Sequence, residues 1–303
     1  MGTTNPARLA ASQFSGTNQF SNLVPEAWVK ELLRHFDANR VFKTLVNFKY
    51  ESTIKGHLDT VHIRKIGRPT IQNYERNGTV TFEDMTDSKI TFTIDQQKTW
   101  AIKIDDLDVA DMDIDILERY VEQAAIALAI TIDAYIEGLF VAGASSANDL
   151  GTSGTPIAIT KSNVYDTLVD YSQVLTDTNT LPNGKLPSIV VPTKFVSAVR
   201  KSPEAKDKST SLGDKVVRTG DSLGEYGGFN LIPSTKMAAN AGVYTLIAIT
   251  STEAATFAMK VSKLERVRLT SQGKFANGIM ALYFYGGKVI YPEMVGRVYC
   301  TIS

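Results

Sequence analysis

The residues best suited to chemistry in this chain are the aspartates of the acidic run at residues 105–115, DDLDVADMDID. Carboxylates at alternate positions can bind calcium, but an EF-hand loop also needs glycine at its sixth position and glutamate at its twelfth. No register of this run contains a glycine. Asp111, Asp113 and Asp115 instead precede an apolar helical pattern, where negative charge complements the positive end of a helix. We therefore interpret the run as a helix start and predict no metal site.

Histidine and cysteine are too scarce for a zinc centre or a nucleophilic dyad. Of three histidines, His57 and His62 are five residues apart, so they would point to opposite faces of one strand. The single cysteine, Cys300, lies in a strand-like segment without a nearby histidine, which favours a buried small residue over a nucleophile. We predict no catalytic residue and no cofactor.

Two glycine-rich stretches superficially resemble nucleotide-binding loops. In the stretch ending Gly-Gly-Lys at 286–288, Leu282 replaces the first glycine of a phosphate loop and Val289 replaces its Ser/Thr. The stretch GEYGG at 224–228 follows a polar loop and opens no helix, unlike a dinucleotide-binding fingerprint. We interpret both stretches as turns.

Composition limits the function classes that fit the chain. With 303 residues, 43% of them hydrophobic, it is long enough to bury one large core or two modest ones. Thirty-two basic residues balance thirty-two acidic ones, so no global attraction to nucleic acid or membrane is expected. One cysteine and no signal-like segment favour folding in a reducing cytoplasm. The most apolar stretch, 124–136, is shorter than a membrane span, so no membrane association is expected.

The elements that precede the acidic run look poorly anchored on their own chain. Residues 1–24 are polar, with Phe14 and Phe20 as isolated apolar anchors, and we predict a docking arm followed by a short helix over 25–39. Residues 51–96 change to period two and predict a long hairpin with its tip between 67 and 78. Such a hairpin is marginal alone, so a neighbouring subunit is expected to support it.

The outgoing hairpin strand is expected to include Val80 and Phe82 and to run on to Trp100, Ile102 and Ile104. A long amphipathic helix is then predicted over about 111–141, with Asp111 as its N-cap and Gly143 just past its end. A mixed lobe of helices and strands follows over 152–255. Strand-like alternation over 256–303 is expected to pack back on the long helix, so the fold class is α+β with the middle lobe inserted.

Charge is distributed unevenly between the hairpin and the entrance to the long helix. The basic candidates are Arg64, Lys65, Arg68 and Arg76, and the acidic candidates are Asp105, Asp106 and Asp108. Two ordinary solvated faces would explain this pattern. The alternative hypothesis is that the hairpin of one subunit lies on the acidic region of the next, with charge fixing the register. It predicts that Arg68→Glu or Arg76→Glu impairs assembly and leaves the monomer folded.

In order of elements, the chain resembles the tailed-bacteriophage major capsid proteins of the Hong Kong 97 type. The resemblance covers an N-arm over 1–50, an E-loop over 51–96, a peripheral domain over 97–151 with the spine helix, an axial domain over 152–255 and peripheral return strands over 256–303. The most family-like stretches are GEYGGFNLIPS and FANGIMALYFYGGKVIYPEMVG, together with the spine helix DIDILERYVEQAAIALAITIDAYIEGLF. None of them carries a catalytic signature.

This resemblance implies an icosahedral shell of hexamers and pentamers that encloses double-stranded DNA. Because the charges of the chain balance, we expect its contact with the DNA to be weak and non-specific. The resemblance also implies a separate scaffolding protein, a portal and, in some relatives, a cement protein, with the chain in the virion after assembly in the host cytoplasm. Some relatives cross-link lysines to asparagines, and Lys55, Lys65 and Asn277 have suitable types. An encapsulin-like compartment and an α+β enzyme with a carboxylate site remain as alternatives.

Overall fold

The computed structural model divides into two compact units, formed by residues 1–39, 99–129 and 263–282 and by residues 40–98, 130–262 and 283–303. Each unit is described by itself. The structure describes residues 32–36, 41–54, 56, 58–66, 70–73, 76, 79, 82, 84, 87–105, 115–177, 186–206, 224–237, 239–268 and 276–302.

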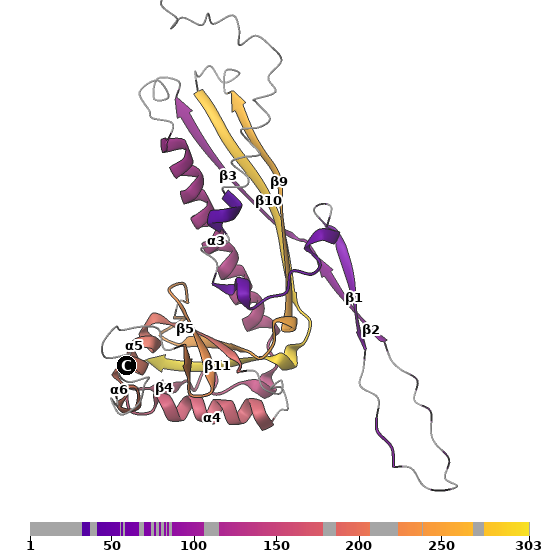
Figure 1. Cartoon of the computed structure of the whole chain (residues 1–303), viewed down its shortest axis with the longest axis vertical. Coiled ribbons are helices and arrows are strands. Elements are labelled where there is room, and N and C mark those ends of the chain that lie inside the picture. Colours follow the sequence, from indigo (N-terminus) through magenta and orange to yellow (C-terminus); the bar gives the residue numbers. More distant parts are fainter. Residues whose placement is uncertain are drawn as a thin grey trace, which may run out of the picture. The chain divides into compact units, whose positions relative to one another are not determined.

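The longest element is helix α3, Asp115–Gly143 (Figure 1). It confirms the predicted long helix, but Gly143 is its last residue and does not follow its end. The reason is packing, because a Cβ at Gly143 would lie 2.5 Å from Cγ2 of Val289. Glycine here lets the last turn of the helix approach a strand closely. The predicted N-cap, Asp111, lies outside the described residues.

Three long strands form a sheet in the order β3-β10-β9: Gln96–Asp105, Ala276–Val289 and Ala255–Arg268. Within the second unit, the ring of Tyr135 on α3 lies 5.1 Å from that of Tyr285 and 6.5 Å from that of Phe257. The predicted packing of these returning strands on the long helix is therefore confirmed.

A six-stranded mixed sheet has the order β4-β11-β8-β5-β7-β6. Its strands are Ile157–Ile159, Val295–Ile302, Tyr244–Ile249, Ser188–Pro192, Phe229–Ser234 and Glu225–Tyr226. Strand β11 runs parallel to β4 and antiparallel to β8, and β5 runs antiparallel to β8 and parallel to β7. Strand β11 was predicted to pack on the long helix with the other returning strands. Alternation identifies a strand but not its sheet, and β11 belongs here.

The helices of this lobe pack into one core with the sheet. They are α4, Val164–Asp177, α5, Thr193–Lys201, and the short α6, Pro203–Lys206. Leu168 and Tyr171 of α4 share a buried cluster with Phe195 and Val199 of α5. The mixed lobe of helices and strands predicted over 152–255 is thus present.

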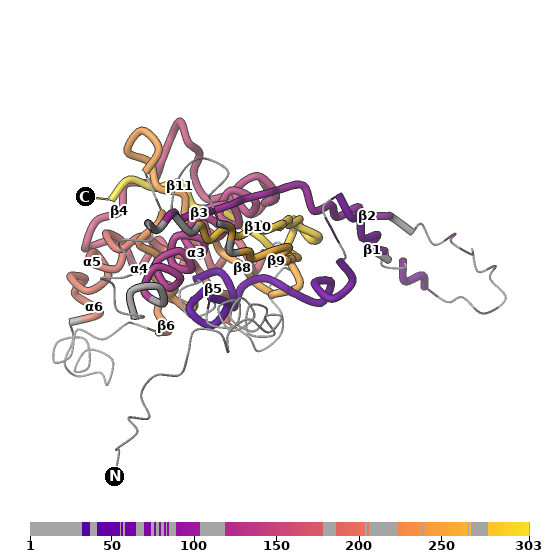
Figure 2. Tube along the Cα trace, turned by 90° about the horizontal axis from the view of Figure 1, so that it is seen from above, coloured from indigo at the N-terminus to yellow at the C-terminus, as the bar shows by residue number. Residues whose placement is uncertain are grey.

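The hairpin strands are β1, Thr60–Ile66, and β2, Asp87–Thr93, which run side by side as an antiparallel pair (Figure 2). The predicted second strand began too early, because Phe82 lies outside β2 and its side chain is exposed. The hairpin is also anchored on its own chain. Ile63 and Phe92 pack with Ala258 and Ile290 in a buried cluster. The apolar residues of the hairpin alone did not predict this anchor, because its partners lie far away in the sequence.

Short helical segments lie before and between the strands. Residues 32–36 are helical, and 3-10 turns are present at Phe42–Thr44, Glu51–Thr53, Ser146–Asn148, Thr252–Ala254 and Pro292–Met294. The segment after the first 3-10 turn is tied to β9, because Asn47 donates its N–H to Ala255 and accepts one from Phe257 at 2.9 and 3.0 Å. The N-terminal part of the second unit is thereby fixed to the returning strand.

One described helix is long and apolar enough to cross a membrane, by length and composition alone, over Arg119–Gly143. The apolar stretch at 124–136 is too short to cross a membrane, but the helix extends beyond both of its ends. Ile132, Ile136 and Phe140 are fully buried on their own chain, and Asp133 is buried as well. A buried stripe of this kind is typical of a helix in the core of a globular fold.

Candidate subunit interface

The hairpin has one apolar face and one basic face. In the register of β1 and β2, Ile63 stands opposite Ile90, and Val61 opposite Phe92. These residues line the cluster that anchors the hairpin. On the other face Arg64 stands opposite Lys89, and both are exposed. Two cations side by side on this face would attract a nearby anionic surface.

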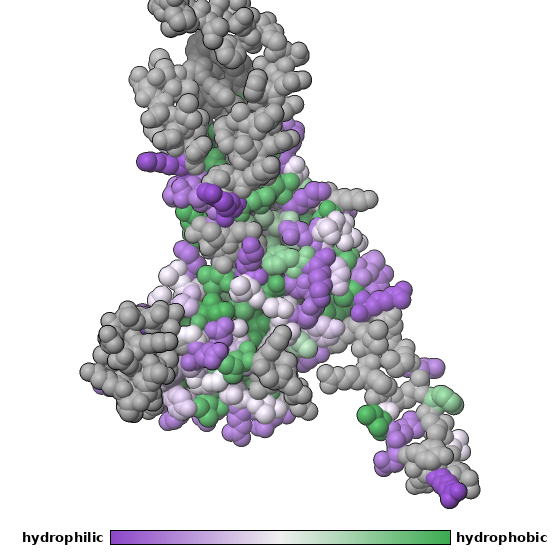
Figure 3. Space-filling model, in the orientation of Figure 1, coloured by the Kyte–Doolittle hydropathy of each residue, from purple (hydrophilic) through white to green (hydrophobic). Residues whose placement is uncertain are grey.

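Beyond the strands, the loop exposes two large hydrophobic side chains. Ile71 is 96% exposed and Phe82 is 95% exposed. Figure 3 shows hydrophobic as well as hydrophilic residues on the coloured part of this loop. Aromatic and aliphatic side chains of this kind become anchors when a partner buries them. Neither side chain was predicted to lie in the interface, although isolated apolar residues in a polar, glycine-containing segment were a usable signal.

The predicted interface residues are only partly within the described chain. Arg64 and Arg76 are exposed, Lys65 lies in β1, and Asp105 ends β3. Arg68, Asp106, Asp108, Phe14 and Phe20 lie outside the described residues, as does Lys55. The pairing of the basic hairpin with the acidic segment of a neighbour therefore stays a prediction.

The two glycine stretches take different roles. Gly227 and Gly228, at φ +58° and +83°, turn the chain between Tyr226 and Phe229, as expected for a two-residue hairpin. Gly286 and Gly287, predicted as a turn, lie inside β10 instead. A Cβ at Gly286 would lie 2.6 Å from the carbonyl oxygen of Thr93, so glycine permits close strand contact. The turn prediction for 286–288 was wrong because glycine also marks close backbone approach.

Among the described residues, no group of three His, Cys, Asp or Glu side chains could hold a metal ion. Cys300 is fully buried, and burial raises the pKa of its thiol to about 12, which suits a packing role. Buried Asp133 of α3 accepts a 2.8 Å hydrogen bond from the backbone N–H of Val41, at the start of the first 3-10 turn. Its carboxylate is used to join two segments.

One turn along α3, the carboxyl of Glu137 has a raised pKa because of burial and, second, the negative charge of Asp133. A carboxylate with a shifted pKa suggests an active site only where a cavity accompanies it. A cavity of about 310 Å³ in this unit is lined by residues of α5 and β7 and by no carboxylate: Thr193, Val196, Ser197, Arg200, Lys201, Leu231 and Pro233. The shifted carboxyl and this cavity do not coincide.

The family model for phage capsid proteins matches residues 90–295. This chain belongs to the phage capsid protein family. A chain from Mycobacterium phage Che8 is 26% identical to this capsid protein, with a TM-score of 0.69 over 86% of this chain and 90% of that chain. A chain of the capsid of Cyanophage P-SCSP1u is 14% identical, with a TM-score of 0.67 over 86% and 88%. No curated protein matches the capsid protein in sequence.

The fold is also that of a virus-like particle from Pyrococcus furiosus, which is 12% identical with a TM-score of 0.55 over 90% of this chain and 98% of that chain. At this identity the likeness concerns the fold alone. The family match therefore favours a phage head over an encapsulin-like compartment. This capsid protein is a major capsid protein of the Hong Kong 97 fold, a structural component of the virion that assembles with its own copies into an icosahedral shell.

Proposed function

We propose that this capsid protein forms the hexamers and pentamers of a phage head that encloses double-stranded DNA, with the E-loop of each subunit lying on a neighbour. The exposure of Ile71 and Phe82 carries this proposal. Two large apolar side chains on an extended loop cost free energy in water, and a neighbouring subunit would bury them. The basic face at Arg64 and Lys89 would meet negative charge in the same contact.

The packaged DNA is expected to touch the shell weakly and without sequence preference. The chain has a net formal charge of zero, so it offers no overall excess of cations to neutralise phosphates. Condensation of DNA by the shell alone is therefore not expected. We propose that a portal admits the DNA, that a separate scaffolding protein guides assembly in the host cytoplasm, and that a cement protein can bind outside.

The test of this function is negative-stain electron microscopy of the full-length chain, expressed with and without the neighbouring genes of its source genome. Closed shells that contain nuclease-resistant double-stranded DNA after packaging support the proposal. Shells that contain a protein cargo and no DNA would instead support the encapsulin-like alternative. A monomer in every combination of genes would contradict both.

Arg76→Glu tests the part of the proposal that concerns the E-loop charge. Arg76 is exposed in the loop, so its reversal should leave the chain folded and reduce the yield of shells. Lys161→Glu, at an exposed position in another lobe, makes the same change in charge and should have no effect on yield. Equal yields from the two variants would reject the charge contact.

A further inference from the structure

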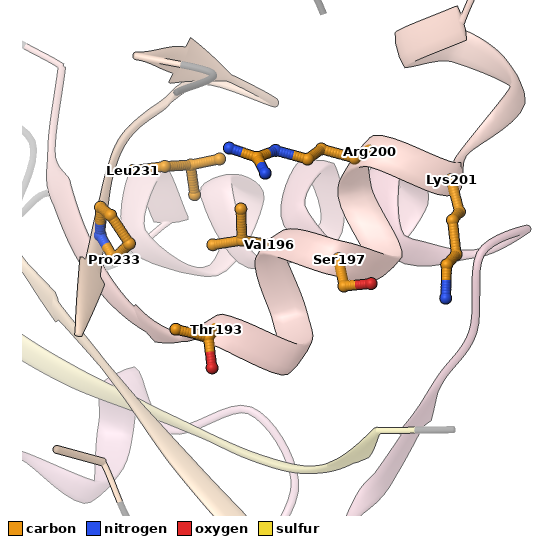
Figure 4. Close-up of a pocket in the computed structure, with 7 residues that line it drawn as sticks. All are labelled: Thr193, Val196, Ser197, Arg200, Lys201, Leu231 and Pro233. Atoms are coloured by element: carbon orange, nitrogen blue, oxygen red, sulfur yellow. The ribbon is translucent and has the colours of Figure 1, made fainter. Parts of the chain in front are cut away.

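The cavity beside α5 is a groove with an apolar floor and a basic end. Val196, Leu231 and Pro233 supply the apolar surface, and Arg200 and Lys201 supply the charge. In Figure 4 the Arg200 side chain runs along α5 towards Leu231. The groove has a volume of about 310 Å³, which is in the range of sites that accept a few side chains. The groove therefore suits an anionic segment that also carries apolar side chains.

Helix α4 presents a face with this combination. Tyr165 and Val169 are 38% and 44% exposed, and they lie four residues apart on the helix. Asp166 and Asp170 are exposed beside them at the same spacing. Residues four apart lie on one face of a helix, so this α4 face carries an apolar row next to an acidic row. The exposed ring of Tyr165 packs edge-on against Tyr226 at 5.5 Å, which limits its freedom before binding.

A chain cannot place its own α4 face in its own groove. Leu168 and Tyr171, on the opposite side of α4, lie in the same buried cluster as Phe195 and Val199 of α5. The α4 face therefore points away from the core that fixes the groove. Only another copy of the chain can bring this face to it.

We propose that the α4 face of one subunit docks in the α5/β7 groove of the next subunit. The two surfaces are different parts of one chain, so the contact is heterologous, and repetition with a suitable rotation closes a ring. This inference rests on the proposed assembly into hexamers and pentamers, and it names the two surfaces that join their subunits.

Asp166 lies in the first turn of α4 and Arg200 and Lys201 in the last turn of α5, where helix dipoles also favour their charges. Asp170 lies in the middle of α4 and has no such role.

Charge reversal on each surface tests the contact. The first variant, Asp166→Lys with Asp170→Lys, makes the α4 face basic, and the second, Arg200→Glu with Lys201→Glu, makes the groove acidic. Each variant alone then meets its own copies with like charges, and the yield of shells should fall about tenfold or more. A chain that carries all four changes regains opposite charges at every contact and should recover shell formation.

A mixture of the two variants gives a sharper result. Each variant attracts the other and repels itself, so the two must alternate around a ring. Rings with an even number of subunits can close, and pentamers cannot. The mixture should therefore give hexamers or open hexamer sheets by electron microscopy and native mass spectrometry, without closed shells.

The matched control for the groove variant is Lys98→Glu with Lys236→Glu, which changes the charge by the same amount and sign at exposed positions outside the groove and the α4 face. It should assemble as the unaltered chain does. Circular dichroism and urea denaturation must show that all variants fold. Normal shell yield from either reversal, or no recovery with all four changes, overturns the docking proposal while the assembly of the unaltered chain stands. If the unaltered chain forms no shells with its neighbouring genes, the proposed function itself fails.

Discussion

Arg297 and Asp149 form a two-point ion pair, with Nε to Oδ1 at 2.9 Å and Nη2 to Oδ2 at 2.6 Å. Both side chains are largely buried, at 16% and 15% exposed. Arg297 also donates from Nη1 to the carbonyl oxygen of Val141 at 2.7 Å. Val141 lies in the last turn of α3, where unpaired carbonyls attract a cation. One guanidinium on β11 thus joins the end of the spine helix to the loop before β4.

Arg297→Ala should lower the free energy of unfolding by about 2–3 kcal/mol, because it leaves Asp149 and the carbonyl of Val141 without their donor. Urea denaturation of the unassembled full-length chain, followed by circular dichroism, measures this. Lys263→Ala is the control, since it removes an ion pair between two more exposed side chains. Lys263 is 65% exposed and its partner Glu265 is 37% exposed. The control should cost less than about 0.5 kcal/mol. Equal costs for the two variants would contradict the structural role of Arg297.

Tyr171→Phe should make the protein more resistant to alkali. The Tyr171 hydroxyl is buried without a hydrogen-bond partner among the described residues, and burial raises its pKa above the ordinary value of 10.0. The folded state holds this proton more tightly than the unfolded state does. The stability that this provides is complete below pH 10 and is lost as the pH rises above it, by about 1.4 kcal/mol per pH unit.

The Tyr171→Phe variant avoids that loss and keeps its stability at pH 7, because the hydroxyl it removes makes no hydrogen bond there. Urea denaturation at pH 7, 10 and 11 measures the difference. Tyr120→Phe, at an exposed position of α3, controls for removal of a tyrosine hydroxyl. If Tyr171→Phe and the unaltered chain lose stability in parallel between pH 10 and pH 11, Tyr171 is not the group responsible.

The sequence predicted the elements whose residues repeat on a regular period. The spine helix was predictable because Val121, Leu128 and Ile132 recur at helical spacing, and all three are buried as expected. Strand β8 was predictable as a short apolar run. In both cases local sequence and tertiary packing favour the same structure.

Partners across long sequence distances could not be predicted in this way. Strand β11 pairs with β8 and β4, and Phe92 of the hairpin packs with Ile290, about 200 residues away in the chain. For the interface, composition indicated the basic hairpin, but the exposure of Phe82 became visible only in the structure. The alternating pattern predicted Phe82 to lie in a strand, because this pattern is the same whether the side chain is buried or exposed.

Glu137→Gln should stabilise the protein at neutral pH. The pKa of Glu137 is raised by burial and by Asp133, so the folded state favours the protonated form. The stability contributed by that form is complete below the ordinary pKa of 4.5 and is lost as the pH rises through the raised value. Glutamine keeps the neutral form at every pH. Because the side chain is partly exposed, the expected gain at pH 7 is about 0.2–0.5 kcal/mol, the scale of a like-charge pair one helical turn apart.

Urea denaturation at pH 4 and pH 7 checks the Glu137 prediction. The gain should be present at pH 7 and shrink at pH 4, where the glutamate is itself largely protonated. Glu225→Gln, at an exposed position of β6, makes the same chemical change and should give no comparable gain. A gain of the same size at both pH values would point to a cause other than the charge of Glu137.

Two phenylalanines of the hairpin region should separate folding from assembly. Phe92 is fully buried in the anchoring cluster, whereas Phe82 is 95% exposed. Phe92→Ala should lower the free energy of unfolding by about 3–5 kcal/mol, because it leaves a cavity. Phe82→Ala should leave that free energy within about 0.5 kcal/mol and reduce shell yield instead, because its side chain is buried only by a neighbour.

The two phenylalanine variants are compared by urea denaturation of the unassembled chain and by counting shells in electron micrographs at equal protein concentration. Phe82→Leu keeps an apolar side chain at the same place and should restore part of the yield, whereas Phe82→Ser should not. Because the Phe82 side chain is exposed in the isolated subunit, a loss of yield without a loss of stability locates the contact between subunits. If Phe82→Ser assembles as well as the unaltered chain, Phe82 does not anchor the E-loop.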